Sequence, residues 1–288
     1  MCDNDIHPGL IEDWSLSRRA FLVTGAAAAG MATVANAAET NVVEKDVTIP
    51  TGDGSADAAL FYPAGKGSWP AVLMWPDIMG LRPVFREMGR RLAAQGYVVL
   101  VPNPFYRSRK APVVDGPIDF SNKEATQKLF GYRAAMTNEG VDKDAVAYLA
   151  FLDAQPQTAK RKKAGVQGYC MGGPLAFRTA AAVSSRIGAV GTFHGGGLVA
   201  ANAPDSPHLL IPKTKAAFLI CIARNDDARD PTAKDVLKAA FAAAGRPATV
   251  EVYPGDHGWC VPGSQVYNQE AAERAWSELS KLYKTNLV

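Results

Sequence analysis

A cysteine between glycines is the side chain in this sequence best suited to chemistry. Cys170 lies in the stretch 168–173, Gly-Tyr-Cys-Met-Gly-Gly, after a partly apolar stretch at 163–167 and before an alanine-rich stretch at 174–182. A strand, a sharp glycine-flanked turn and a helix form a nucleophile elbow, which exposes one side chain at the carboxyl end of a sheet. A helix N-terminus also favours a thiolate. Cys170 is therefore the candidate nucleophile; a small buried cysteine in a glycine-rich turn is the alternative.

Two polar residues further along the chain could complete a catalytic triad. Asp226 and His257 each follow an apolar stretch that is typical of a strand. The order nucleophile, acid, histidine is the one found in α/β-hydrolases. We therefore expect His257 to act as the base and Asp226 to orient it. Asp227 is adjacent, and spacing alone does not choose between the two acids. His257 could also be an ordinary histidine of a surface turn.

Two backbone N–H groups are the candidate oxyanion donors. One belongs to Met171, directly after the nucleophile, and the other to Ile78, in the loop 76–82 that follows the apolar run 70–75. Asp77 comes immediately before Ile78. Its carboxylate could hydrogen-bond the resting thiol and influence its ionisation; a plain turn aspartate is the alternative.

Several further side chains are candidates to surround the substrate. The run His-Gly-Gly-Gly at 194–197 looks like the oxyanion motif of lipases but follows the nucleophile, so His194 is taken as a lining residue. Arg82 and Arg107 are candidates to meet an acidic group. The aromatic candidates for an apolar pocket are Trp75, Phe105, Tyr106, Tyr132 and Trp259.

Strand and helix patterns alternate along the chain. Apolar or alternating stretches predict strands at 42–49, 58–62, 70–75, 97–101, 163–167, 187–193, 216–222 and 248–253. Helices are predicted at 83–95, 121–136, 141–154, 174–182, 231–244 and 268–284. The first two strands form an antiparallel hairpin, and 103–120 is a loop or small cap. The pattern predicts one α/β domain with a mostly parallel central sheet, helices on both faces and ligands at the carboxyl ends of the strands.

The N-terminus has the features of an export signal. Arg18 and Arg19 form a twin-arginine motif, a weakly apolar stretch follows at 23–34, and Ala-Asn-Ala at 35–37 fits a cleavage site after Ala37. We expect residues 1–37 to be a signal peptide read by the twin-arginine export machinery, and 38–288 to be a periplasmic or secreted domain without a membrane segment. An alanine-rich helix of the mature fold is the alternative.

Composition excludes several classes of protein. The formal net charge of +3 over 288 residues is too weak to indicate a nucleic-acid partner. Cysteine and histidine spacing does not fit a metal site, and we expect no cofactor. The four cysteines do not form a disulfide framework, although a pair between Cys221 and Cys260 is conceivable in an exported protein. A monomer or a small homo-oligomer is expected.

The chain resembles the dienelactone hydrolase family of α/β-hydrolases over about residues 45–285. The resemblance rests on 168–173, on Pro-Asp-Ile-Met-Gly-Leu-Arg at 76–82, on Arg-Leu-Ala-Ala-Gln-Gly-Tyr at 91–97 and on Gly-Asp-His-Gly at 255–258.

The resemblance implies a function. It implies the α/β-hydrolase fold and cleavage of a small ester or lactone through a covalent acyl-enzyme. Its Cys-His-Asp triad maps onto Cys170, His257 and Asp226, and its oxyanion donors map onto Met171 and Ile78.

Two positions depart from the family members that cleave dienelactone. Asp77 stands where those members have a glutamate, and Val261 stands where they have an arginine that binds the substrate carboxylate. A non-catalytic ligand-binding protein on a hydrolase scaffold is the alternative function. A thiol redox protein is a third hypothesis, but Cys170 has no resolving cysteine nearby in the sequence.

Overall fold

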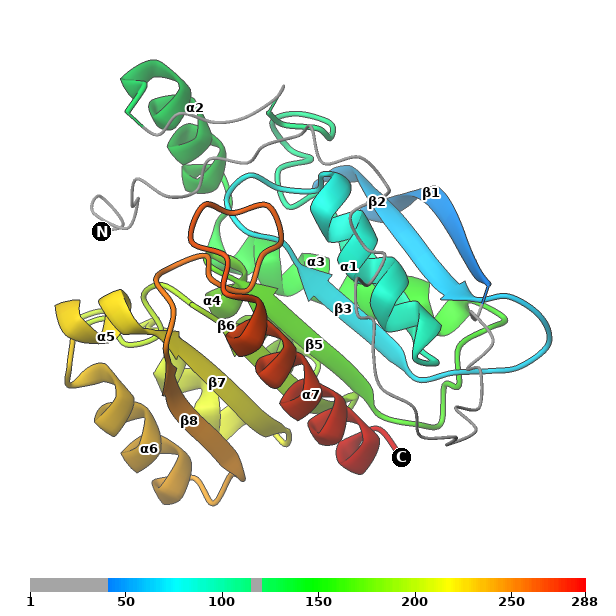
Figure 1. The fold of residues 1–288 in the computed structure, drawn as a ribbon. Helices are drawn as coiled ribbons and strands as arrows, with labels where there is room; N and C mark the ends of the chain where they lie inside the picture. The colour runs from blue at the N-terminus through cyan, green and yellow to red at the C-terminus, as the bar shows by residue number, and fades with distance from the viewer. Residues whose placement is uncertain (1–40, 115–120) are drawn as a thin grey trace, which may run out of the picture.

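An eight-stranded sheet forms the centre of the molecule (Figure 1). This computed structural model describes residues 41–114 and 121–288, so the predicted export signal, with Arg18, Arg19 and Ala37, lies outside the described residues. The strands run in the order β1-β2-β4-β3-β5-β6-β7-β8. Their bounds are Val42–Thr51 (β1), Gly54–Pro63 (β2), Ala71–Trp75 (β3), Val98–Pro102 (β4), Ala164–Tyr169 (β5), Ile187–Phe193 (β6), Ala217–Ala223 (β7) and Ala248–Tyr253 (β8).

The sheet is mostly parallel, which confirms the predicted α/β class. β1 and β2 form the antiparallel hairpin, and β2 also pairs antiparallel with β4. From β4 across to β8 every pairing is parallel. All residues of β3, β4 and β5 are buried, as expected for parallel strands covered on both faces.

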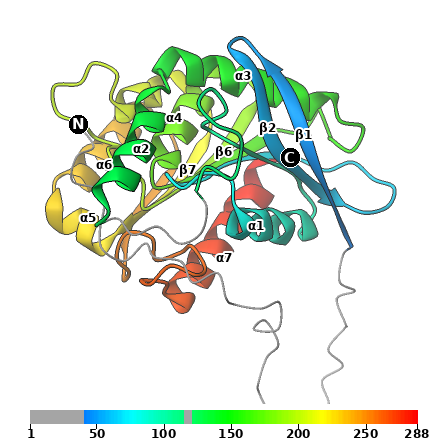
Figure 2. The same cartoon turned by 90° about the horizontal axis from the view of Figure 1, so that it is seen from above.

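Helices cover both faces of the sheet (Figure 2). The main helices are α1 (Pro83–Ala94), α2 (Lys123–Ala134), α3 (Asn138–Ala154), α4 (Gly172–Ala182), α6 (Ala233–Ala243) and α7 (Gln269–Asn286). Leu73 belongs to the same core cluster as the apolar side chains of α3, α4 and α6 on one face. Its neighbours Val72 and Met74 belong to the cluster of α1 and α7 on the other, because successive strand residues point to opposite faces.

Two short helices were not predicted. One is a 3-10 helix, η1 (Pro207–Lys213), and the other is α5 (Arg224–Arg229), directly after β7. Asp226, which follows the predicted strand 216–222, lies in the first turn of α5. Two aspartates in a first turn suit the positive end of the helix dipole, which favours a helix in this polar segment.

The segment after β4 begins with turns. Residues 103–114 contain turns rather than a regular element, and α2 follows at Lys123 after residues outside the described range. Phe105, Val113 and Leu129 join the core cluster on the α3 and α4 side. In the described part of the chain no helix is both long and apolar enough to cross a bilayer.

Candidate active site

Cys170 lies in a turn that only glycine neighbours allow. It follows β5, precedes α4, and has a positive φ of 52°, which is uncommon for a residue with a side chain. A Cβ atom on Gly168 would lie 1.9 Å from the carbonyl oxygen of Gly172, and a Cβ atom on Gly172 would lie 2.6 Å from the carbonyl oxygen of Trp75. The side chain of Cys170 is half-buried and remains accessible. These are the features of the nucleophile elbow that the sequence indicated.

His257 and Asp226 meet as an imidazole–carboxylate pair. The Oδ2 atom of Asp226 lies 2.7 Å from Nδ1 of His257. Asn225 accepts a hydrogen bond of 2.8 Å from the backbone N–H of His257, which holds the histidine turn against α5. Asp227 instead accepts a hydrogen bond of 2.7 Å from Lys234. The geometry therefore selects Asp226 over Asp227 as the acid that contacts the histidine.

The electrostatics of His257 connect it to Cys170. The ring is buried, and burial alone would lower its pKa. The charge and hydrogen bond of Cys170, together with the hydrogen bond to Asp226, outweigh burial and raise the pKa of His257 to about 10. Since Nδ1 bonds Asp226, the other ring nitrogen, Nε2, is the one available to Cys170. Asp226 and His257 are therefore joined by a hydrogen bond, and Cys170 favours the charged form of the same ring.

The loop that carries Ile78 lies against the elbow. The carbonyl oxygens of Trp75 and Pro76 are the nearest atoms to the space beside Gly172. The loop 76–82 and the elbow leave the sheet next to each other, because β3 and β5 are parallel and Trp75 of β3 pairs with Gly168 of β5. The two predicted oxyanion donors, Met171 and Ile78, are thus carried on backbone segments that meet.

Asp77 has contacts other than the predicted hydrogen bond to the thiol. Its carboxylate forms a buried two-pronged ion pair with Arg82, at 2.6 and 2.9 Å. It also accepts a hydrogen bond of 2.9 Å from the backbone N–H of Met79. Buried carboxylates require such partners, and here the partners belong to the same loop. Asp77 therefore fixes the backbone on either side of Ile78.

The two arginines proposed to meet an acidic group are both held by internal carboxylates. Arg82 is fully buried against Asp77. Arg107 pairs with Asp144 at 2.7 Å and with Asp53 at 2.7 Å, which ties the turn of the β1–β2 hairpin to α3. Their charges are neutralised within the fold, so the structure does not support a role for them in binding an anion.

The predicted pocket aromatics mainly have packing roles. Trp75 is fully buried and donates a hydrogen bond of 3.0 Å from Nε1 to Thr179 of α4. Trp259 is fully buried and stacks on Tyr253 at 4.8 Å between ring centroids. Tyr106 donates a hydrogen bond of 2.7 Å to Asp144. Phe105 and Tyr132 pack on each other, with ring centroids 6.0 Å apart. The prediction of a pocket lined by Trp75 and Trp259 is not supported, because their rings fill the core.

His194 is brought directly into the site. Its ring lies edge-to-face on the ring of His257, with centroids 4.7 Å apart. The sequence singled out His194 as a lining residue, but the contact with His257 depends on the exits of β6 and β8 and has no local signal. Asn225 and Arg229 were missed altogether; Arg229 donates a hydrogen bond of 2.8 Å to the Oδ1 atom of Asp226.

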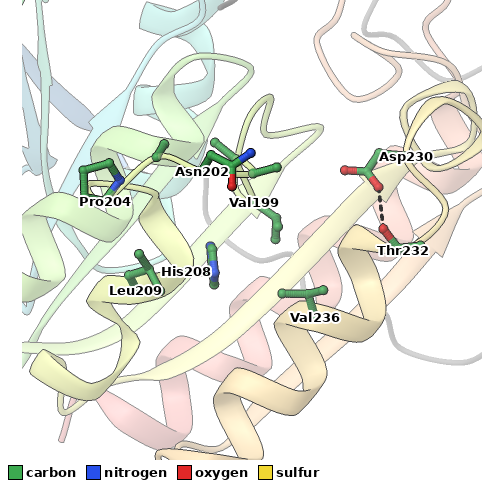
Figure 3. A pocket seen from close by; sticks show the side chains of 11 residues that line it. Val199, Asn202, Pro204, His208, Leu209, Asp230, Thr232 and Val236 are labelled. Atoms are coloured by element: carbon green, nitrogen blue, oxygen red, sulfur yellow. Dashed lines mark hydrogen bonds between the residues drawn. The ribbon is translucent and has the colours of Figure 1, made fainter.

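An open groove of about 670 Å³ lies between the segment 199–209 and the start of α6 (Figure 3). Val199, Leu209 and Val236 give it an apolar wall, and His208 and Asp230 add polar groups. Its lining does not include Cys170 or His257, so the groove is not the space at the candidate nucleophile.

The two other cysteines within residues 41–114 and 121–288 are free thiols. Cys221 and Cys260 are buried and unbridged, so the conceivable disulfide between them is not formed. Burial raises the pKa of both thiols, which disfavours the reactive thiolate. Within residues 41–114 and 121–288, no group of three or more His, Cys, Asp or Glu side chains could hold a metal ion.

The chain is similar to known proteins over most of its length. The sequence profile of the Dienelactone hydrolase family matches residues 56–287. A carboxymethylenebutenolidase of Pseudomonas putida is 30% identical over 140 residues, which cover 49% of this chain and 57% of that protein. A candidate carboxymethylenebutenolidase of Synechocystis is 25% identical over 244 residues, which cover 84% of this chain and 96% of that protein.

Solved structures share the fold. A candidate dienelactone hydrolase from Klebsiella pneumoniae superposes with a TM-score of 0.73 at 22% identity, covering 85% of this chain and 99% of that chain. At this level of identity the structural likeness concerns the fold alone.

The raised pKa of His257 predicts a specific titration. Nuclear magnetic resonance of the imidazole should give a midpoint near pH 10 in the unsubstituted protein. Asp226→Asn and Cys170→Ala should each lower the midpoint, because each removes a group that favours the imidazolium. Asp227→Asn is the matched control and should leave it unchanged, because Asp227 bonds Lys234. A midpoint of the unsubstituted protein at or below about 6.5 would contradict the arrangement.

The raised pKa of His257 also makes the stability of the fold depend on pH. Folding raises the pKa of His257 from 6.5 to about 10. Protonation of this ring therefore stabilises the fold fully below pH 6.5, and that contribution is lost as the pH rises towards 10.

Proposed function

Because this chain belongs to the dienelactone hydrolase family, we propose that it hydrolyses small carboxylic esters or lactones through a Cys170–His257–Asp226 triad. The observation that carries the proposal is the connected set of side chains at the elbow. Asp226 lies 2.7 Å from Nδ1 of His257, and the interaction with Cys170 raises the pKa of the same ring. A triad requires a nucleophile, a base and a group that orients the base, and these residues have contacts that suit those roles.

The first half of the proposed reaction acylates the cysteine. The Cys170 thiolate attacks the carbonyl carbon, and the carbonyl oxygen becomes an oxyanion that accepts hydrogen bonds from the N–H groups of Met171 and Ile78. When the tetrahedral intermediate collapses, the carbon–oxygen bond of the ester breaks. The His257 imidazolium gives its proton to the leaving alkoxide, which leaves a thioester on Cys170 and a neutral imidazole.

The second half releases the acid. The neutral imidazole of His257 takes a proton from water as the water oxygen attacks the thioester carbon. Collapse of this intermediate breaks the carbon–sulfur bond and returns the Cys170 thiolate beside the imidazolium. Asp226 accepts the hydrogen bond from Nδ1 throughout, so Nε2 remains directed at the reacting groups.

We propose that the preferred substrates carry no charge near the scissile bond. Carboxymethylenebutenolidase, the name of the Pseudomonas putida relative, denotes an enzyme for a butenolide with a carboxymethylene group. In this chain Arg82 and Arg107 are neutralised by internal carboxylates, and Val261 is buried among apolar side chains. A substrate carboxylate would therefore lose its hydration without gaining an arginine partner.

The first test removes the nucleophile. Cys170→Ala should lower kcat/KM for p-nitrophenyl acetate by about 1,000-fold or more, with the melting temperature close to that of the unsubstituted protein. Cys221→Ala is the matched control, because it removes a buried thiol from β7 and should keep the activity. Full activity in Cys170→Ala would refute the mechanism. The absence of hydrolysis by the unsubstituted protein across esters, lactones and thioesters would favour a binding function.

The second test compares two substrates of similar length. p-Nitrophenyl butyrate should be hydrolysed with a kcat/KM at least about tenfold higher than mono-p-nitrophenyl succinate, which ends in a carboxylate. The chemistry at the scissile bond is the same in both, so the ratio measures the cost of the added charge. An equal or higher value for the succinate would show that a cationic group meets the substrate.

We also propose that residues 1–37 direct export by the twin-arginine route. The support is the order of the twin-arginine motif, the weakly apolar stretch and the Ala-Asn-Ala site. In a bacterial host the full chain should appear in the periplasmic fraction with a new N-terminus at Ala38. Replacing Arg18 and Arg19 together by lysine keeps the charge and should leave an unprocessed chain in the cytoplasm. Equal export of that variant would contradict the proposal.

A further inference from the structure

His194 occupies a backbone position that favours glycine. It follows β6 with a φ of 40°, in the left-handed region that residues other than glycine seldom adopt, although Asn, Asp and His do so more often than the rest. Three glycines follow at 195–197, and any glycine would adopt this conformation without steric strain. The chain instead has a histidine there. Strain of this kind persists where the side chain has a role, so the imidazole requires an explanation.

The imidazole is not used for hydrogen bonding within the described residues. His194 is only 1% exposed, and neither Nδ1 nor Nε2 has a hydrogen-bond partner in the described part of the chain. Its backbone N–H, by contrast, donates a hydrogen bond of 2.8 Å to the carbonyl oxygen of Cys221, which fixes the residue between β6 and β7. The backbone of His194 is therefore held by a hydrogen bond, and its imidazole interacts mainly with other rings.

The ring that His194 touches is that of the candidate base. The His194 and His257 centroids are 4.7 Å apart and the planes are inclined by 67°, an edge-to-face arrangement. The ring of His194 also lies near that of Tyr169, with the ring centroids 6.3 Å apart. Nδ1 of His257 bonds Asp226, and His194 contacts the face or edge of the ring without competing for that bond.

The charges around this pair require His194 to be neutral. Burial and the nearby charge of His257 both lower the pKa of His194 well below its ordinary value. The titratable groups that face His257 are Asp226 from α5, Cys170 from the elbow and His194 from the exit of β6, and Arg229 pairs with Asp226. A second imidazolium at 4.7 Å would oppose the protonation of His257, whereas an uncharged ring does not.

We propose that His194 is a positioning residue: an uncharged ring that holds His257 between Asp226 and Cys170 and so maintains the thiolate–imidazolium pair. This inference rests on the proposed triad. Without the ring, His257 could turn away from Cys170, and the sulfur would lose the cation that favours its thiolate. The loss would then appear in the ionisation of Cys170 and in kcat rather than in substrate binding.

The experiment measures the rate at which iodoacetamide alkylates Cys170 as a function of pH, together with kcat and KM for p-nitrophenyl acetate. His194→Asn removes the ring but suits the left-handed backbone, so the fold should survive. We expect its alkylation profile to move up by about one pH unit and its kcat to fall about tenfold, with little change in KM. His194→Phe keeps a neutral ring, so its alkylation profile and its kcat should both be close to those of the unsubstituted protein.

His208→Asn is the matched control, because His208 lies in the groove of Figure 3 and bonds Ser206 instead of the triad. It should behave like the unsubstituted protein. Unchanged alkylation and kcat in His194→Asn would overturn the inference, as would a His194→Phe variant no better than His194→Asn. Alkylation requires no ester hydrolysis. A shifted profile in a protein without hydrolytic activity would therefore support His194 while refuting the proposed function.

Discussion

The close backbone contact at the elbow is the constraint on which the site depends. The end of β5, the start of α4 and the end of β3 approach one another so closely that a Cβ atom on Gly168 or on Gly172 would clash with the neighbouring backbone. This contact exposes the sulfur of Cys170 and also presses the start of α4 against the end of β3. The loop with Ile78 follows β3, so one steric requirement sets the position of the proposed nucleophile relative to the proposed oxyanion donors. The buried ion pair between Asp77 and Arg82 then holds that loop in shape.

The sheet register supplies the other half of the site. Ala223 of β7 lies opposite Tyr253 of β8, so α5 and the histidine turn leave the sheet side by side. A hydrogen bond of 2.8 Å from the N–H of Arg224 to the carbonyl oxygen of Gly255 joins the two segments at their starts. The contact between Asp226 and His257 therefore depends on the parallel pairing of two strands, rather than on any feature of the loops alone.

Local pattern was sufficient to predict the fold, and it indicated three candidate site residues, two of which, Asp226 and His257, the structure brings into contact. The strands are continuous apolar runs, the elbow is one short motif, and the order of Cys170, Asp226 and His257 can be read along the chain. The choice between Asp226 and Asp227 could not be made in this way. Successive residues of a helix point about 100° apart, so the answer required the helix α5 that the sequence did not reveal. The pairing of Arg82 and Arg107 and the inward direction of Trp75 likewise depend on the folded environment.

The state of the thiols has a practical consequence for chemical biology. Of the three cysteines in the described residues, Cys221 and Cys260 are sealed in the core, and only Cys170 is accessible at the surface. Among the described residues, an electrophilic inhibitor or reporter group should therefore attach at a single position, Cys170 at the elbow, because the other two sulfur atoms are shielded by the fold. The domain is thus suited to site-selective covalent profiling without prior removal of other cysteines from its core.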